Sequence, residues 1–223
     1  MSLTISAAQV DALIANPSSI SGYSASSPII ITGAITHTQA TNLNAVDATY
    51  IQATISETTA ANLAAISVDN STRASLNKFS VVVSDTSATA AELNAVSAIT
   101  SVAADFSNVT GIEASPSSAI TTLYTASTTG LGNETISVND TTLNAATLNA
   151  INGYTTGTVT ITATSLAGNA ADLLTAVKNT GNGVTGVDVP VTVTDTGSVD
   201  AGTLALLVDE LVADGNGDKE TVS

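Results

Sequence analysis

The sequence predicts an α/β repeat solenoid, in which a parallel β ladder carries one short helix or tight helical turn per repeat. A phrase built around leucine recurs along the whole chain, and a segment of alternating aliphatic and polar residues precedes many of its copies. A right-handed parallel β-helix is the alternative, because a helix of about seven residues is marginal by itself. In both cases we expect a single elongated domain over residues 1–223 with about eight repeats.

The recurring phrase consists of small residues, a polar residue, Leu, one further residue, and then Ala with an aliphatic residue. Its clearest copies are residues 60–66, 90–96 and 145–151, and weaker copies centre on Val10, Leu43, Leu123, Leu173 and Leu204. Within a copy, apolar residues three positions apart, such as Leu93 and Val96, share one face of a helix and leave Asn94 outside. Each copy is therefore predicted to form about two helical turns.

The segments before these phrases alternate with a period of two. Residues 81–86, 136–141 and 191–196 end in Asp-Thr, and residues 158–164 show the same alternation without the Asp. Segments rich in Val, Ile and Thr with this period are typical of half-buried strands. Because successive strands are joined through a helix, they are predicted to run parallel.

Helix start signals stand four residues before the central apolar residue. Most copies have a capping side chain there, namely Ser6, Thr59, Thr89, Asn144, Asn169 and Asp200. Thr89 forms a capping box with Glu92. Gln39 and Ala119 occupy this position in the second and fifth copies. Those two helices are therefore predicted to be the least well defined.

Composition and charge exclude several classes of partner. The chain has 4 Lys and Arg against 19 Asp and Glu, a formal net charge of −15, and no cysteine. Nucleic acid is not an expected partner, because phosphate contacts need clustered cations. Membrane insertion is not expected either, since no apolar run approaches the ~20 residues of a spanning helix. Without cysteine there are no disulfides and no thiolate metal sites.

Three phrases resemble the Ala/Thr/Asn-rich repeat modules of long bacterial, cyanobacterial-type surface or secreted proteins. They are LTISAAQ at residues 3–9, SDT at 84–86 with AAELNA at 90–95, and TTGTV at 155–159. The resemblance covers nearly the whole chain and implies an extracellular or cell-surface location. The glycine-rich G-G-x-G-x-D calcium repeats are absent, so the calcium chemistry of those repeats is not implied.

Few residues offer catalytic chemistry. The one histidine, His37, stands near a helix start and is interpreted as a surface or capping residue. Asp85, Asp140 and Asp195 recur every 55 residues, and Glu57 and Asp85 fall in adjacent repeats, so a carboxylate pair of a sugar-cleaving β-helix is one hypothesis. The favoured interpretation is structural: an Asp before Thr at a strand end fixes the turn through Asx-type hydrogen bonds.

The C-terminal region offers the one metal candidate. Asp214, Asn216 and Asp218 place oxygen ligands at alternate positions, as in the first half of a calcium loop. A plain acidic tail is the favoured interpretation, and no cofactor other than this calcium is expected. Before it, an amphipathic stretch longer than the other copies predicts that residues 201–223 form a capping helix followed by this tail.

The outward strand positions Thr160, Thr162, Thr192 and Thr194 form a predicted hydroxyl-rich row that could bind an ordered surface such as ice or a glycan. We therefore expect a non-enzymatic structural or adhesive module, extracellular or at the cell surface. Its expected partners are further copies of itself, joined head to tail or laterally, a surface glycan, or another surface protein. The alternatives are a phage virion fibre or decoration protein, and a carbohydrate-active β-helix enzyme that uses paired Asp.

Overall fold

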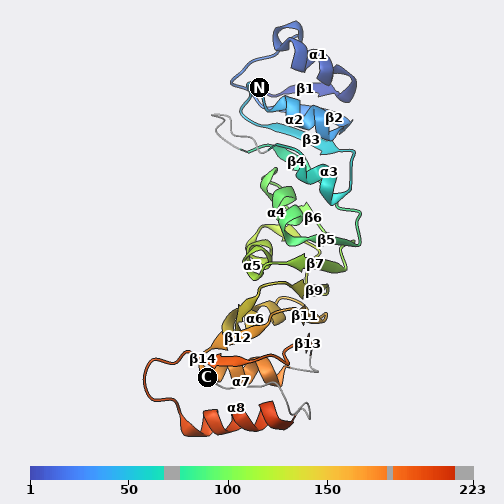
Figure 1. Ribbon diagram of the computed structural model, residues 1–223. Coiled ribbons are helices and arrows are strands. Elements are labelled where there is room, and N and C mark those ends of the chain that lie inside the picture. The colour runs from blue at the N-terminus through green and yellow to red at the C-terminus, as the bar shows by residue number, and fades with distance from the viewer. Residues whose placement is uncertain (68–75, 180–182, 214–223) are drawn as a thin grey trace. The chain divides into compact units, whose positions relative to one another are not determined.

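The computed structural model describes residues 1–67, 76–179 and 183–213 (Figure 1). It is an α/β protein in which strands and short helices alternate in repeat-like β–α units, and neighbouring strands run parallel. The predicted alternation of parallel strands and short helices is therefore confirmed. The chain divides into two compact units, Met1–Val109 with Thr125–Gly130, and Thr110–Tyr124 with Leu131–Ser223.

The first unit contains a four-stranded parallel sheet in the order β1-β2-β3-β4. Leu3 lies beside Ile29, and Ile29 lies beside Ile51, so aliphatic side chains recur at the same point of successive strands. The strands of this unit are β1 (Leu3–Ser6), β2 (Ile29–Ile35), β3 (Ile51–Ile55), β4 (Lys78–Ser80), β5 (Ser87–Thr89), β6 (Ala104–Asp105) and β8 (Thr128–Thr129). Its helices are η1 (Ala7–Gln9), α1 (Val10–Ala15), η2 (Pro17–Ser19), α2 (His37–Leu43), α3 (Ala60–Ala64) and α4 (Ala90–Ala98).

The second unit contains two parallel ladders. The strands that this unit contributes to one ladder are β7 (Gly111–Ser115), β9 (Thr135–Val138), β11 (Val159–Ile161) and β13 (Val184–Thr185). The other consists of β10 (Thr142–Asn144), β12 (Ser165–Gly168) and β14 (Val191–Val193). The helices are α5 (Ser117–Thr125), α6 (Ala145–Asn152), α7 (Ala170–Lys178) and α8 (Ala201–Ala213).

The second ladder was not predicted as a separate ladder, and of its strands only β14 lies within a segment predicted as a strand, residues 191–196. Each of its strands has only three or four residues. The strand β10 ends immediately before α6, and β12 ends one residue before the start of α7. In β10 a single apolar side chain, Leu143, is buried between two exposed polar neighbours. A segment with one apolar residue has no measurable period, so the pattern could not distinguish it from a loop.

The core follows the predicted helix faces. The central residues of the first seven phrases are fully buried, namely Val10, Leu43, Leu63, Leu93, Leu123, Leu148 and Leu173. In the last phrase Leu207, rather than Leu204, is the fully buried residue. The helix α8 packs against α7, and its longer apolar stretch turns this different face inward.

Several predicted helix caps are confirmed. The Thr89 hydroxyl accepts from the Glu92 N–H (3.2 Å), and the Thr89 N–H donates to the Glu92 carboxylate (3.0 Å), which completes the capping box. Asn144 and Asn169 accept from the N–H of the third helical residue in α6 and α7. These bonds satisfy donors that have no partner within the helix.

The prediction for the second and fifth helices is wrong. The helix α2 begins earlier than expected, because Thr36 is its N-cap and Gln39 is the other half of a capping box. The helix α5 has nine residues and begins directly after Pro116, so it is as long as α4 and α7. Counting a fixed four residues back from the central leucine missed both starts, because Leu43 and Leu123 lie seven residues after Thr36 and Pro116.

Two neighbouring leucines of α8 provide a matched test of burial. Leu207 is fully buried, whereas the side chain of Leu206 is 51% exposed. We expect Leu207→Ala to lower the free energy of unfolding by about 2–5 kcal/mol, because it leaves a cavity in the core. Leu206→Ala should change it by no more than about 0.5 kcal/mol. Urea denaturation of both variants checks this, and equal effects would contradict the described face of α8.

Candidate functional site

Carboxylates that follow a strand, or in the case of Asp85 the isolated bridge at Val82, bind the first residue of the preceding helix. Each of four carboxylates accepts the backbone N–H of the first residue of α2, α3, α5 or α7. The pairs are Glu57 with His37 (2.8 Å), Asp85 with Ala60 (2.5 Å), Asp140 with Ser117 (2.6 Å), and Asp195 with Ala170 (2.8 Å). Each carboxylate lies 20 to 25 residues after the helical residue whose N–H it accepts. We call each of these four links a clasp.

A backbone hydrogen bond accompanies each carboxylate. The residue before the acid donates its N–H to the carbonyl two residues before the helix begins. These bonds are Ser56 to Ile35 (2.8 Å), Ser84 to Thr58 (2.7 Å), Asn139 to Ser115 (3.1 Å), and Thr194 to Gly168 (2.8 Å). The two bonds together fix the end of one strand against the start of the preceding helix. The same geometry at all four positions indicates a repeated structural element.

The clasp has a clear physical basis. The first N–H groups of a helix have no partner inside the helix, and the helix dipole places partial positive charge there. A carboxylate satisfies both requirements, and a charged acceptor forms a stronger hydrogen bond than a neutral one. Each clasp therefore stabilises a short helix and joins it to the next strand.

The Asx-turn interpretation of Asp85, Asp140 and Asp195 needs correction. Their carboxylates accept an N–H 23 to 25 residues earlier in the chain, so they join successive repeats. A local Asx-type contact is found instead at Asp105, whose carboxylate accepts the Ser107 N–H at 2.9 Å. This backbone hydrogen bond, assisted by the Ser107 side chain, lowers the pKa of Asp105.

Asparagine side chains form a second link between repeats. The Asn149 amide, in α6, donates to the Asp172 carbonyl of α7 at 3.0 Å. The Asn44 amide donates to the Ser67 carbonyl at 2.7 Å. Both asparagines are half-buried, although the sequence placed the residue after the leucine on the outer face. The recurrence of Asn directly after Leu, as at Leu43, Leu93 and Leu148, was the signal that could have found this link.

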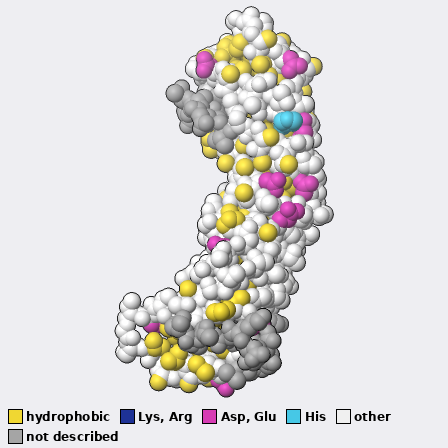
Figure 2. Space-filling view, viewed as in Figure 1, with side chains coloured by type: hydrophobic (Ala, Val, Ile, Leu, Met, Phe, Trp, Pro, Cys, Tyr) yellow, Lys and Arg dark blue, Asp and Glu magenta, His cyan; other side chains and the backbone are white. Residues whose placement is uncertain are grey.

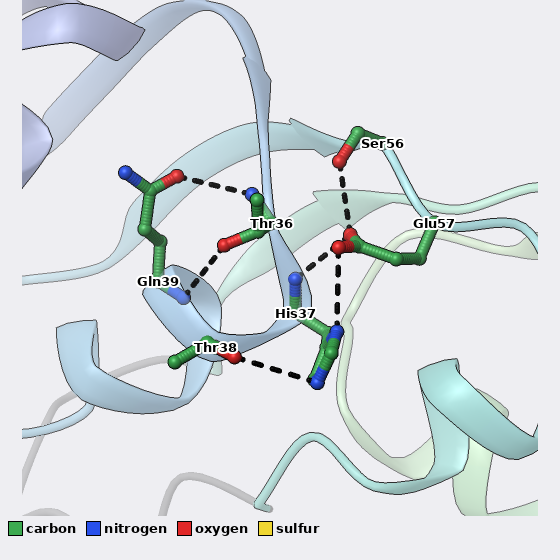
Figure 3. Close-up of polar contacts among 6 residues, drawn as sticks. All are labelled: Thr36, His37, Thr38, Gln39, Ser56 and Glu57. Carbon is green, nitrogen blue, oxygen red and sulfur yellow. Dashed lines mark hydrogen bonds and ion pairs between the residues drawn. The ribbon is translucent and has the colours of Figure 1, made fainter.

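The clasp at α2 also contains the one histidine (Figure 3). Glu57 Oε2 accepts from the His37 N–H and, at 2.9 Å, from the Ser56 hydroxyl, while Glu57 Oε1 lies 3.3 Å from His37 Nδ1. On the other side of the ring, Nε2 lies 3.4 Å from the Thr38 hydroxyl. Figure 2 shows the imidazole, in cyan, at the visible surface with acidic side chains beside it. The sole histidine is thus part of the link between α2 and the end of β3.

The environment of Glu57 favours its ionised form. Burial, the largest single influence, raises the pKa, but hydrogen bonds from Ser56, from its own backbone and from His37 outweigh it, so the pKa of Glu57 is lowered. A lowered carboxyl pKa means that the clasp stabilises the fold above the pKa of the unfolded carboxyl. This stabilisation is lost as the pH falls through the folded pKa.

Glu57, His37 and Thr38 follow one another as the acid, histidine and hydroxyl of a hydrolytic triad do. Their contacts nevertheless fit a structural link at the start of α2 better. Glu57 Oε2 already accepts two hydrogen bonds, one of them from the backbone of His37 itself. The distance of 3.4 Å between Nε2 and the Thr38 hydroxyl is longer than the about 2.6–3.2 Å that is usual between a nucleophile and its base. The group holds the start of α2 in place.

A buried carboxylate occupies the second unit. Glu134 is fully buried and accepts the Tyr124 hydroxyl at 2.6 Å and the Gly132 N–H at 2.8 and 2.9 Å. The Tyr124 ring stacks on Tyr154, with centroids 4.9 Å apart and an interplanar angle of 9°. Burial, with the hydrogen bond and charge of Glu134, raises the pKa of Tyr124. A single Glu without a recurring pattern gave no signal of this cluster in the sequence.

The predicted hydroxyl row divides between the two ladders. Thr160 lies beside Ser137 and Thr185, and its hydroxyl is 3.0 Å from that of Thr185. Thr192 lies instead beside Ala167 in the other ladder. The expected alignment of Thr160 and Thr162 with Thr192 and Thr194 in one row is therefore wrong, because β11 and β14 belong to different ladders. Whether these threonines bind a surface stays a prediction.

The predicted calcium ligands Asp214, Asn216 and Asp218 lie outside the described residues. Within the described residues, no group of three or more His, Cys, Asp or Glu side chains could hold a metal ion. A search of the same residues finds no helix with the length and apolar character to cross a membrane.

Removing one clasp tests its contribution to stability. We expect Asp140→Ala to lower the free energy of unfolding by about 0.5–2 kcal/mol, as for the loss of a helix cap, and Asp140→Asn by less, because the amide oxygen still accepts. The Ser117 amide should lose protection from hydrogen exchange in the alanine variant. Asp209→Asn, at an exposed position of α8, is the control and should change stability by no more than about 0.5 kcal/mol. Equal effects at both positions would contradict the clasp.

The raised pKa of Tyr124 predicts a loss of stability in alkali. The unfolded chain releases the Tyr124 proton near pH ~10, whereas the folded chain retains it. The stabilisation is therefore complete below that pH and is lost as the pH rises above it. We expect absorbance at the tyrosinate band to show at least one tyrosine that ionises only on unfolding. This tyrosine should be missing in Tyr124→Phe, and its persistence in that variant would contradict the assignment.

Comparisons of the chain with protein-family models, curated proteins and solved structures each gave no match. The resemblance to Ala/Thr/Asn-rich repeat modules therefore stays a prediction, and the functional proposal depends on the residues of this chain.

Proposed function

We propose that this chain is a non-enzymatic structural or adhesive repeat module, extracellular or at the cell surface, with its repeat-like units stacked as an α/β solenoid. The observation that carries the proposal is the clasp. Three of the four clasp acids, Asp85, Asp140 and Asp195, are the acids that recur most regularly in the sequence, and their described role is to bind helix N–H groups. A protein whose repeated acids join its own repeats is built for rigidity.

The carboxylates considered for sugar cleavage support this interpretation. A glycosidase needs two carboxyl groups facing one bond, with one free to donate a proton. Glu57 and Asp85 each accept the first N–H of a different helix, α2 and α3 respectively. Each of the two carboxylates is therefore engaged in a link to its own helix.

The location proposed for the module follows from composition and resemblance. The chain is strongly acidic, has few charged residues overall, and has no cysteine. Its stability would then derive from inter-repeat hydrogen bonds and small aliphatic side chains, which need no reducing or oxidising compartment. The similarity of its phrases to long bacterial surface proteins supports a position outside the cell.

Small-angle X-ray scattering of the chain tests the solenoid. A compact globular chain of this length has a radius of gyration of about 17 Å. We expect a clearly larger value with a rod-like distance distribution. A compact value would contradict the stacked arrangement and leave the adhesive role without its rigid support.

Incubation with insoluble polysaccharides tests the absence of enzymatic activity. We expect the chain either to sediment with a polysaccharide or to stay in solution, in both cases without release of reducing ends. Release by the wild-type chain that is lost in Asp85→Asn and in Glu57→Gln would overturn the proposal in favour of a carbohydrate-active enzyme. Leu206→Ala, at an exposed position, is the control for the preparation.

A further inference from the structure

We propose that the His37–Glu57 clasp is a pH-responsive link, which tightens when the imidazole takes up a proton and so holds α2 to the end of β3 more firmly in mild acid. This property does not depend on the adhesive role proposed above. It rests on the position of both ring nitrogens and both carboxylate oxygens.

The chain contains only one side chain that ordinarily gains or loses a charge between pH ~5 and ~8. His37 is the single histidine, and there is no cysteine. Of the remaining groups, only an α-amino terminus ordinarily titrates between pH ~5 and ~8. A change in the stability of α2 over this range can therefore be assigned to one residue.

The ring of His37 stands between two oxygen atoms. Nδ1 faces Glu57 Oε1 at 3.3 Å, and Nε2 faces the Thr38 hydroxyl at 3.4 Å. Nδ1 is buried and forms no aligned hydrogen bond with any described group. A neutral imidazole carries one N–H, whereas the imidazolium carries two. The protonated ring is thus the form that offers a donor to both oxygens and a positive charge to the carboxylate.

Two carboxylates and the α2 dipole are the charges that face or adjoin the ring. Glu57 faces His37 from the end of β3, and Asp11 of α1 reaches the same helix by accepting the Gln39 amide at 2.9 Å. The positive end of the α2 dipole opposes a cation at its first residue, but Glu57 lies at this same point. Among the described residues of the first unit, the one Lys or Arg is Lys78, which lies 4.1 Å from the centroid of the Tyr50 ring.

Glu57 keeps its charge in the range where His37 gains one. Because the pKa of Glu57 is lowered, its carboxylate remains ionised well below the pH at which an imidazole takes up a proton. The clasp at α3 provides an internal comparison in the same unit. There Asp85 accepts the Ala60 N–H in the same way, but the first helical residue has no titratable side chain.

Hydrogen exchange of the full chain, followed by NMR from pH ~8 to ~5.5, tests the inference. After correction for intrinsic exchange, we expect the protection of the His37 amide to rise about two- to fivefold relative to that of Ala60, as for a surface ion pair. The ring protons of the single histidine report its protonation in the same samples, and the rise should follow them. Parallel changes at His37 and Ala60 would overturn the inference.

Two variants complete the test. His37→Gln keeps the backbone N–H of the clasp and removes the titrating ring, so residue 37 should lose the pH response and keep its protection at pH ~8. Asp85→Asn is the matched control and should leave the response of His37 intact. If the response persists in His37→Gln, the imidazole is not its source and the inference fails.

Discussion

The hydrogen bond from the first N–H of a helix to a carboxylate of the following repeat is the interaction on which the described repeats depend. The helices α2, α3, α5 and α7 have five to nine residues, a length at which a helix is unstable in isolation. An acceptor at the N-terminus lowers the cost of starting the helix, and the strand that carries the acceptor is fixed by the same contact. Helix formation and strand pairing are thereby coupled, so neither depends on a large apolar core.

This coupling explains how so many polar residues coexist with a narrow core. The fully buried aliphatic side chains recur about once per helical turn, and only two phenylalanines, Phe79 and Phe106, contribute large rings to the buried set. Many of the remaining links are polar contacts between side chain and backbone, such as Thr100 to the Phe79 carbonyl at 2.8 Å and Thr155 to the Glu134 carbonyl at 2.6 Å. Because each contact joins residues 21 positions apart, it acts between neighbouring repeats rather than within one.

The sequence revealed the parts of the structure that have a period. The leucine at the centre of a phrase and the capping residue before it are local signals, and Leu93 and Thr89 lie where they were expected. The sequence singled out Asp85 as a recurring acid but did not predict its hydrogen bond to Ala60. The two residues are 25 positions apart, and nothing local marks the Ala60 N–H as the donor. Contacts of this kind depend on register between strands, which the pattern within one strand does not contain. The buried Glu134 occurs once and had no pattern to reveal it.

The position of a single glycine bears on how such a chain can change in length. Opposite the start of α6 stands Gly168, where an added Cβ would lie 3.0 Å from that of Ala145, so a carboxylate side chain there would crowd the first residue of the helix. Asp85, Asp140 and Asp195 are 55 residues apart, which corresponds to two repeats. Between Asp85 and Asp195, a gene segment that is duplicated or lost in steps of two repeats keeps each of these acids opposite a helix, whereas a step of one would bring an acid against the crowded position of Gly168. We therefore expect changes of length in this part of the chain to favour even numbers of repeats, whereas the adjacent clasps of Glu57 and Asp85 allow single steps nearer the N-terminus.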